Sequence, residues 1–135
     1  MPHEDGAAYH PIVATVSLGA PIVLDIYEKR KESESEGEGE SHGEVTSREP
    51  RFRILQEPRS LLVTTERMYT DYLHGIEERL KDENLRGETI CNWELLGNKG
   101  GFEAGSYARV TRTSLTYRDV LRVSKLGNSI KFLAK

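Results

Sequence analysis

Short apolar runs separated by turn residues are the feature that most constrains the fold of this 135-residue chain. The runs are rich in β-branched residues, and several alternate apolar with polar side chains, which is typical of strands with one buried face. The predicted strands cover residues 12–18, 22–27, 52–55, 60–64, 108–117 and 120–123. Gly19-Ala20-Pro21 and Glu57-Pro58-Arg59 are turn signals between neighbouring strands. Many short strands joined by turns predict a mainly β fold, a double-stranded β-helix (jelly roll) within a single domain, residues 1–135.

Three segments of the sequence depart from this strand pattern. Residues 28–50 contain the low-complexity acidic run from Glu32 to Ser41, which has no apolar side chain to bury and predicts a disordered surface loop. Residues 68–80 have an apolar spacing that fits either a short helical turn before His74 or a helix running through it. Residues 81–106 are polar and glycine-rich, and within them the loop of residues 87–105 is read as a variable surface loop rather than a substrate lid.

Composition excludes several classes of protein. No run is long enough for a membrane span, and the N-terminal residues lack the basic and apolar regions of a signal peptide. The only cysteine, Cys91, cannot form an internal disulfide, which indicates a reducing compartment. Residues 45–135 carry sixteen basic and twelve acidic residues, and this modest excess suits a polyanion as well as it suits an ordinary mixed surface.

The run His3-Glu4-Asp5 places two metal-ligand side chains at alternate positions. In an extended chain these two point to the same side, so both can face one ion. A second histidine, His74, is far along the chain in Tyr72-Leu73-His74-Gly75. Two imidazoles and one carboxylate suit Fe(II) with coordination positions left open for a cosubstrate and dioxygen. Taken alone, His-X-Asp is more often a solvated pair than a metal site.

Arg112 and Arg118 form an Arg-x5-Arg pair. Residues six apart lie on one face of a strand, and two guanidinium groups can bind the carboxylates of a small diacid between them. The same face carries the polar residues Ser114 and Thr116. Turned inward, this polar face needs a ligand, whereas turned outward it needs nothing, and the sequence leaves the choice open.

These motifs, in this order, resemble the AlkB family of Fe(II)- and 2-oxoglutarate-dependent dioxygenases, most of all its sixth eukaryotic branch. The similar stretches cover most of the chain outside residues 28–50 and 82–106. They are MPHEDG, YHP, VSLG, VLDIY, LQEPRSLLV, YTDYLHGI and RTSLTYR. The resemblance implies that His3, Asp5 and His74 ligate Fe(II). It also implies that Arg112 holds the distal carboxylate of 2-oxoglutarate, with Arg118 nearer the metal.

The resemblance implies oxidative demethylation of an alkylated nucleic acid or related substrate, and a location in the nucleus and cytoplasm. It also implies irregular structure up to His74 and a strand from about Ile76. The family's Asn-x-Tyr motif, which precedes the His-X-Asp, is absent from this sequence. This predicts an N-terminally truncated jelly roll, incomplete on that side, with little or no turnover by itself. The alternative is a catalytically weak or inactive fragment that acts as a binding or interaction protein.

Overall fold

A computed structural model describes residues 1–29 and 49–122 of the chain. The acidic segment and the last thirteen residues therefore lie outside the described residues, and the predicted disordered loop stays a prediction. The strands are β1 (Tyr9–Leu18), β2 (Ile22–Glu28), β3 (Phe52–Gln56), β4 (Leu61–Thr65), β5 (Tyr72–Gly75), β6 (Lys81–Glu83), β7 (Ser106–Ala108) and β8 (Thr113–Val120). The helical elements are α1 (Glu66–Thr70) and the 3₁₀ turns η2 (Trp93–Leu95) and η3 (Lys99–Phe102).

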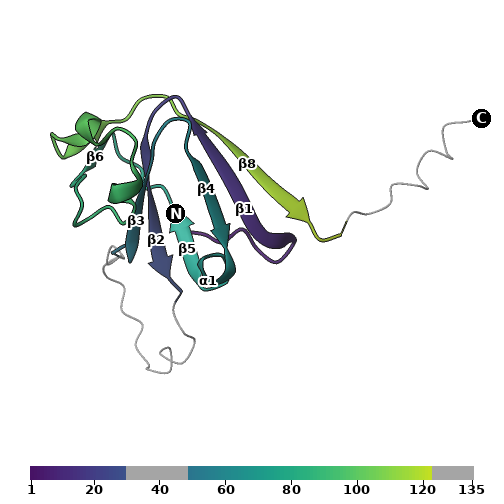
Figure 1. The fold of residues 1–135 in the computed structure, drawn as a ribbon. Coiled ribbons are helices and arrows are strands. Elements are labelled where there is room, and N and C mark those ends of the chain that lie inside the picture. The colour runs from purple at the N-terminus through teal and green to yellow at the C-terminus, as the bar shows by residue number, and fades with distance from the viewer. Residues whose placement is uncertain (30–48, 123–135) are drawn as a thin grey trace, which may run out of the picture.

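The strands form two three-stranded antiparallel sheets, of order β4-β1-β8 and β3-β2-β5, and a separate two-stranded antiparallel sheet of β6 and β7 (Figure 1). The turn between β1 and β2 moves the chain from one sheet to the other, and Gly19 there has a φ of +82°, which favours glycine. The mainly β, jelly-roll-like prediction is confirmed. The strands in residues 1–29 and 49–122 form no closed barrel.

Alternation along β2 divides its side chains between two environments. Leu24 and Ile26 line a cavity between the two three-stranded sheets, whereas Val23 and Asp25 point to the opposite face of the β3-β2-β5 sheet. This opposite face carries the main hydrophobic core, in which Val23 is fully buried. The cluster consists of Val23, Leu55, Leu85, Ile90, Leu96 and Phe102.

Most of that core comes from residues 81–106, whose composition is polar. Leu85, Ile90, Leu96 and Phe102 each expose less than a tenth of their surface. The surface-loop prediction for residues 87–105 was therefore wrong. The segment has irregular backbone, so its apolar residues follow no strand or helix period, and only their packing against the sheet reveals their role.

Buried ion pairs join this segment to the sheet. Asp82 pairs with Arg109 at 2.8 Å and with Arg79 at 3.3 Å. Arg79 also reaches Asp25 on β2 at 2.7 Å, and Arg53 on β3 lies 3.4 Å from the other oxygen of Asp25. Both aspartates are 1 % exposed, so each needs these cations to offset its desolvation.

The structure around His74 shows whether a helix runs through this residue. Of the two readings of residues 68–80, the short turn before His74 is confirmed, because α1 ends at Thr70. The strand expected from Ile76 is instead β5, which contains His74 and pairs Tyr72–Gly75 with β2. Residues 109–112 separate β7 from β8, so the single strand predicted over residues 108–117 is also wrong. Within the described residues, no helix combines the length and apolar character needed to cross a bilayer.

Candidate functional site

A cavity of about 220 Å³ lies between the two three-stranded sheets. Its wall is mixed. One part is apolar, with side chains such as Leu24, Ile26 and Ile54 from the β3-β2-β5 sheet. The other part is polar and includes Gln56 and several residues singled out by the sequence: Asp5, His74, Arg112, Ser114, Thr116 and Arg118. A small, mostly apolar cleft with a few convergent polar groups is the usual form of a ligand site.

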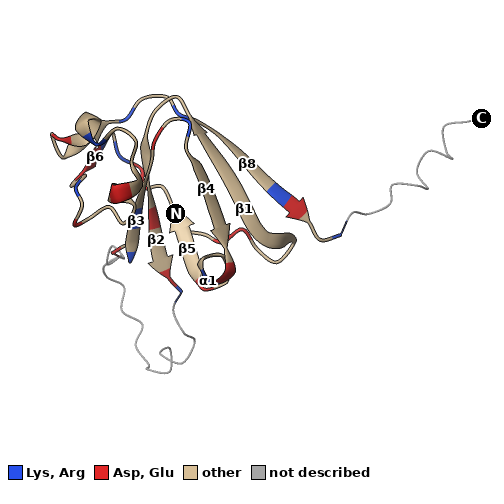
Figure 2. Cartoon of the chain, viewed as in Figure 1, with Lys and Arg blue, Asp and Glu red and all other residues tan. Residues whose placement is uncertain are grey.

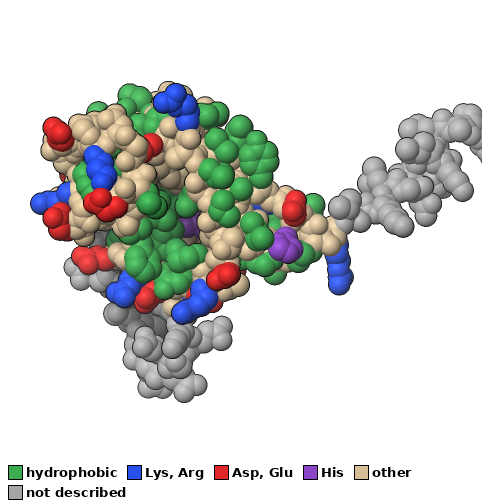
Figure 3. All heavy atoms as spheres, viewed as in Figure 1, with side chains coloured by type: hydrophobic (Ala, Val, Ile, Leu, Met, Phe, Trp, Pro, Cys, Tyr) green, Lys and Arg blue, Asp and Glu red, His purple; other side chains and the backbone are tan. Residues whose placement is uncertain are grey.

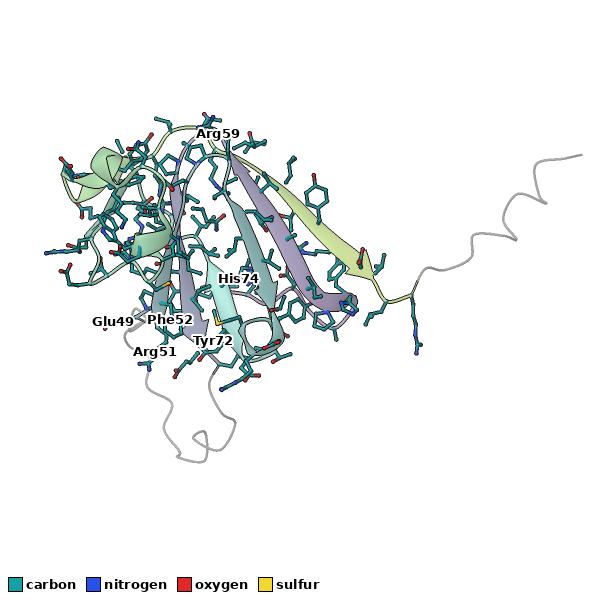
Figure 4. All side chains as sticks on the ribbon, viewed as in Figure 1. Glu49, Arg51, Phe52, Arg59, Tyr72 and His74 are labelled. Carbon is teal, nitrogen blue, oxygen red and sulfur yellow. The ribbon has the colours of Figure 1, made fainter. Side chains whose placement is uncertain are left out.

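His3 and His74 are held together by their backbones. The two residues exchange hydrogen bonds at 2.9 Å in each direction, His3 N to His74 O and His74 N to His3 O. This bridge brings the ring centroids to 4.6 Å. Figure 4 labels His74 on β5, with Tyr72 toward the α1 end of that strand. His3 Nδ1 lies 3.3 Å from the carbonyl of Met1, which can only accept, so the Nδ1–H tautomer leaves the Nε2 lone pair for a metal.

Gly75 permits this close approach of the N-terminal strand. A Cβ added there would lie 3.2 Å from Pro2 Cα and 3.3 Å from Pro2 N, both backbone atoms. A side chain at this position would require the backbone at Pro2 to shift by a few tenths of an ångström. The sequence analysis missed Gly75, although a glycine directly after a candidate ligand was a signal for close backbone approach.

Asp5 lies between the histidine pair and an arginine. Its Oδ2 is 4.0 Å from His74 Nε2, and its Oδ1 is 2.5 Å from an Arg118 guanidinium nitrogen. Burial lowers the pKa of the His74 imidazole, against the opposing charge of Asp5. His74 is therefore biased toward the neutral form, which is the form that binds metals.

Arg112 occupies a different part of the cavity wall. Its guanidinium donates to Ser17 Oγ at 2.7 and 3.2 Å and to Gln56 Oε1 at 3.0 Å. Ser17 and Gln56 are buried and bonded to each other at 3.0 Å. These two neutral groups orient the guanidinium, and among residues 1–29 and 49–122 no carboxylate forms an ion pair with it. Burial lowers the pKa of Arg112, which shows that its charge is incompletely solvated. An anion bound in the cavity would therefore stabilise this cation.

The open question about the polar face of residues 110–118 is thereby answered. Arg112, Ser114, Thr116 and Arg118 all line the cavity, so this face is turned inward. Ser17 and Gln56, which hold Arg112, were missed. Their only sequence signal was a polar residue where β1 and β3 each place an inward-facing side chain.

The side chains of His3, Asp5 and His74 lie together, but they do not form a ready metal cage. Among the residues with described positions, no three His, Cys, Asp or Glu side chains are placed so that they could hold a metal ion. The donors still fit Fe(II) in kind, since they are two imidazoles and one carboxylate. Asp5 and His74 line the cavity, and His3 is bridged to His74. To ligate a metal ion, the Asp5 carboxylate would have to give up part of its ion pair with Arg118.

Comparison with known proteins identifies the family of this chain. No protein-family model matches the chain. The chain is 34 % identical over 123 residues to a zebrafish (Danio rerio) protein described as "Probable RNA/DNA demethylase ALKBH6". The match covers 91 % of this chain and 48 % of the zebrafish protein, so the chain spans about half the length of the relative. The resemblance suggested by the motifs is confirmed: this chain is an AlkB-type homologue, similar to ALKBH6 along nearly all of its length.

Proposed function

We propose that this chain carries the iron and cosubstrate site of an AlkB-type dioxygenase, which demethylates an alkylated nucleic acid by oxidation. The observation that carries the proposal is the convergence of three segments, distant in sequence, on one cavity. Asp5, His74, Arg112 and Arg118 all line it. An interaction protein without a ligand would have no reason to direct two arginines inward.

His3, Asp5 and His74 would hold Fe(II). The backbone bridge between the two histidines orients their rings, and burial keeps His74 neutral and ready to ligate. When bound, Fe(II) with open coordination positions supplies the activation of dioxygen. The apolar wall formed by Leu24, Ile26 and Ile54 limits water near the reacting groups.

Arg112 and Arg118 would bind 2-oxoglutarate by different means. Arg112 is held by neutral partners and can offer its charge to the distal carboxylate as a planar fork. Arg118 already pairs with Asp5, so it lies at the metal end of the cavity and its charge is partly compensated. We therefore expect Arg112 and Arg118 to contribute unequally to the affinity for 2-oxoglutarate.

Binding experiments separate these roles. Mn(II), a redox-inert substitute for Fe(II), should bind the 135-residue chain with one site in calorimetry, and Asp5→Ala and His74→Ala should each abolish that binding. With Mn(II) present, Arg112→Ala should weaken 2-oxoglutarate binding by roughly 10- to 150-fold, the equivalent of one charge-assisted hydrogen-bonded pair of about 1.5–3 kcal/mol. Arg118→Ala should weaken it less.

The matched control is Arg86→Ala, an exposed arginine outside the cavity, which should leave both affinities unchanged. Equal 2-oxoglutarate affinities for the wild type and Arg112→Ala would reject the cosubstrate assignment. Failure of the wild type to bind Mn(II) would reject the metal site. Succinate release with Fe(II), ascorbate, 2-oxoglutarate and a methylated oligonucleotide then tests the reaction itself.

A further inference from the structure

Residues 3–6, which we call the ligand segment, are attached to the rest of the molecule at both ends. At one end, His3 exchanges two backbone hydrogen bonds with β5. At the other end, the Gly6 carbonyl accepts a hydrogen bond of 2.7 Å from the Tyr69 hydroxyl on α1. Asp5 lies between these two attachments, so its backbone cannot move away from β5 without breaking one of them.

The Tyr69 hydroxyl is suited to hold the Gly6 carbonyl. Its side chain comes from α1, the short helix that joins β4 to β5. Desolvation raises the pKa of the hydroxyl, and the nearby Asp5 carboxylate raises it further, so the group stays protonated and can donate. Gly6 has a φ of +85°, a conformation in which any other side chain would be strained. The hydrogen bond therefore holds the chain where it turns after Asp5.

A further attachment of the ligand segment uses Lys29, the residue that follows β2. Its ammonium group forms an ion pair with the Glu4 carboxylate and donates to the Thr70 carbonyl at 2.5 Å. Its backbone N–H donates to the Asp71 carbonyl at 3.2 Å. Figure 2 shows acidic and basic residues around α1 and the nearby end of β2, and Figure 3 shows side chains of both charges at this end of the visible face. Lys29 thus joins the ligand segment to the same short helix that carries Tyr69.

Neither Tyr69 nor Lys29 lines the cavity. We propose that both are positioning residues, which hold the ligand segment so that Asp5 and the two candidate histidine ligands face one ion. This role rests on the function proposed above, because it is a role toward the metal. Asp5 needs such a restraint, since its Oδ1 is 2.5 Å from Arg118 whereas its Oδ2 is 4.0 Å from His74 Nε2. The ion pair draws the carboxylate toward Arg118, and the attachments to α1 keep its backbone beside β5.

The two attachments should contribute unequally to the metal affinity. When one is lost, metal binding has to supply the free energy that orders the ligand segment. The hydrogen bond of Tyr69 is partly buried, and one neutral hydrogen bond corresponds to about a 2- to 12-fold change in a binding constant. The side chains of Lys29 and Glu4 are 35 % and 50 % exposed, so water and salt screen their ion pair, which corresponds to about a two- to fivefold change.

Calorimetry of the whole 135-residue chain with Mn(II) alone tests the effect on the metal. Tyr69→Phe removes only the hydroxyl and should weaken binding about 2- to 12-fold. The matched control Tyr117→Phe removes the hydroxyl of an exposed tyrosine on β8 and should leave the affinity unchanged. Lys29→Ala should weaken binding about two- to fivefold, and Lys29→Arg should retain the wild-type affinity. Lys99→Ala, which removes a comparably exposed lysine that pairs with Glu94, should have no effect.

Amide hydrogen exchange of the metal-free chain separates a positioning role from a merely structural one. Tyr69→Phe should speed exchange at His3 and His74, because their amides form the backbone bridge that docks the ligand segment on β5. It should leave exchange unchanged at Leu55, whose amide donates to the Asn92 side chain at the edge of β3. A loss of overall stability would instead speed exchange at all three amides.

Normal Mn(II) binding by the wild type with unchanged affinity in Tyr69→Phe would overturn the positioning role alone. A wild type that binds no Mn(II) would reject the proposed function as well. Exchange that quickens at Leu55 as much as at His3 would show that Tyr69 stabilises the whole fold, and weaker Mn(II) binding without faster exchange at His3 would also contradict the proposal. Equal affinities for the wild type and Lys29→Ala would exclude Lys29 from the role.

Discussion

The two three-stranded sheets have largely apolar outward faces, yet among residues 1–29 and 49–122 only one of these faces is covered by another segment. On the β3-β2-β5 sheet, Val23 and Leu55 are buried beneath residues 85–102. On the β4-β1-β8 sheet, Leu61 and Val63 face solvent. Alternation in a strand therefore identifies an apolar face, but whether another part of the protein covers it depends on segments far away in sequence.

The covered face is also joined to its covering segment by ion pairs, which the open face lacks within the described part of the chain. The Asp82 and Asp25 carboxylates bind three arginines that connect the covering segment to β2 and β3. Asp82 further accepts the backbone N–H of Val23 at 3.4 Å. Packing supplies the favourable free energy here, and the ion pairs fix the register in which the segment lies on the sheet.

The largest expected effect on stability comes from removing the ion pairs of Asp82. Asp82→Ala would leave Arg109 and Arg79 partly buried without their shared carboxylate, and should lower the free energy of unfolding by roughly 3–5 kcal/mol. Urea denaturation followed by circular dichroism measures the loss. The control is Asp119→Ala on the exposed strand β8, which should change stability by less than about 0.5 kcal/mol. Similar results for the two variants would mean that the ion pairs do not secure the covering segment.

Substituting one leucine on each face compares how much the two faces contribute to stability. Leu55 is 2 % exposed on β3, and Leu61 is 62 % exposed on β4. Leu55→Ala should cost about 2–5 kcal/mol because it removes buried methyl groups and leaves a cavity. Leu61→Ala should cost under about 1 kcal/mol in the monomer, because most of its side chain stays hydrated in the folded state. A loss at Leu61 as large as that at Leu55 would show that the open face is covered in solution.

The smallest effect should appear in the pH dependence of stability. Burial raises the pKa of the Asp25 carboxyl above its ordinary value of 3.8, against the opposing charges of Arg79 and Arg53. The folded protein then binds a proton more readily than the unfolded chain does, between the ordinary and the raised pKa. The contribution of Asp25 to stability is therefore fully present below that range and is lost as the pH rises through it.

Thermal melting of the wild type and Asp25→Asn from pH 4 to pH 7 tests this. The stability of the wild type relative to the variant should increase as the pH falls toward 4. Asp119→Asn, on the exposed strand β8, is the matched control. A wild-type advantage that instead shrinks as the pH falls would mean that the arginines outweigh the desolvation of Asp25.

Much of the candidate site was visible in the sequence because its residues occur in short motifs with strand spacing. The alternation of His3 with Asp5, and of Arg112 with Ser114, Thr116 and Arg118, needs only an extended backbone to place each set on one side. Ser17, Gln56 and Gly75 were not predicted, since an isolated serine, glutamine or glycine carries no periodic signal. Their roles depend on partners 95, 56 and more than 70 residues away.

The sequence by itself determined the mainly β class, the strands from 12 to 64 and the resemblance to AlkB proteins, because side-chain alternation and motif order are local properties of the chain. Only the tertiary structure decided that the face bearing Arg112 is turned inward, that His74 lies within β5, and that residues 85–102 form the core rather than a surface loop. Those outcomes depend on which segments pack together. In irregular backbone, the apolar residues that become buried follow no regular spacing along the chain. The sequence pattern therefore cannot show which of them enter the core.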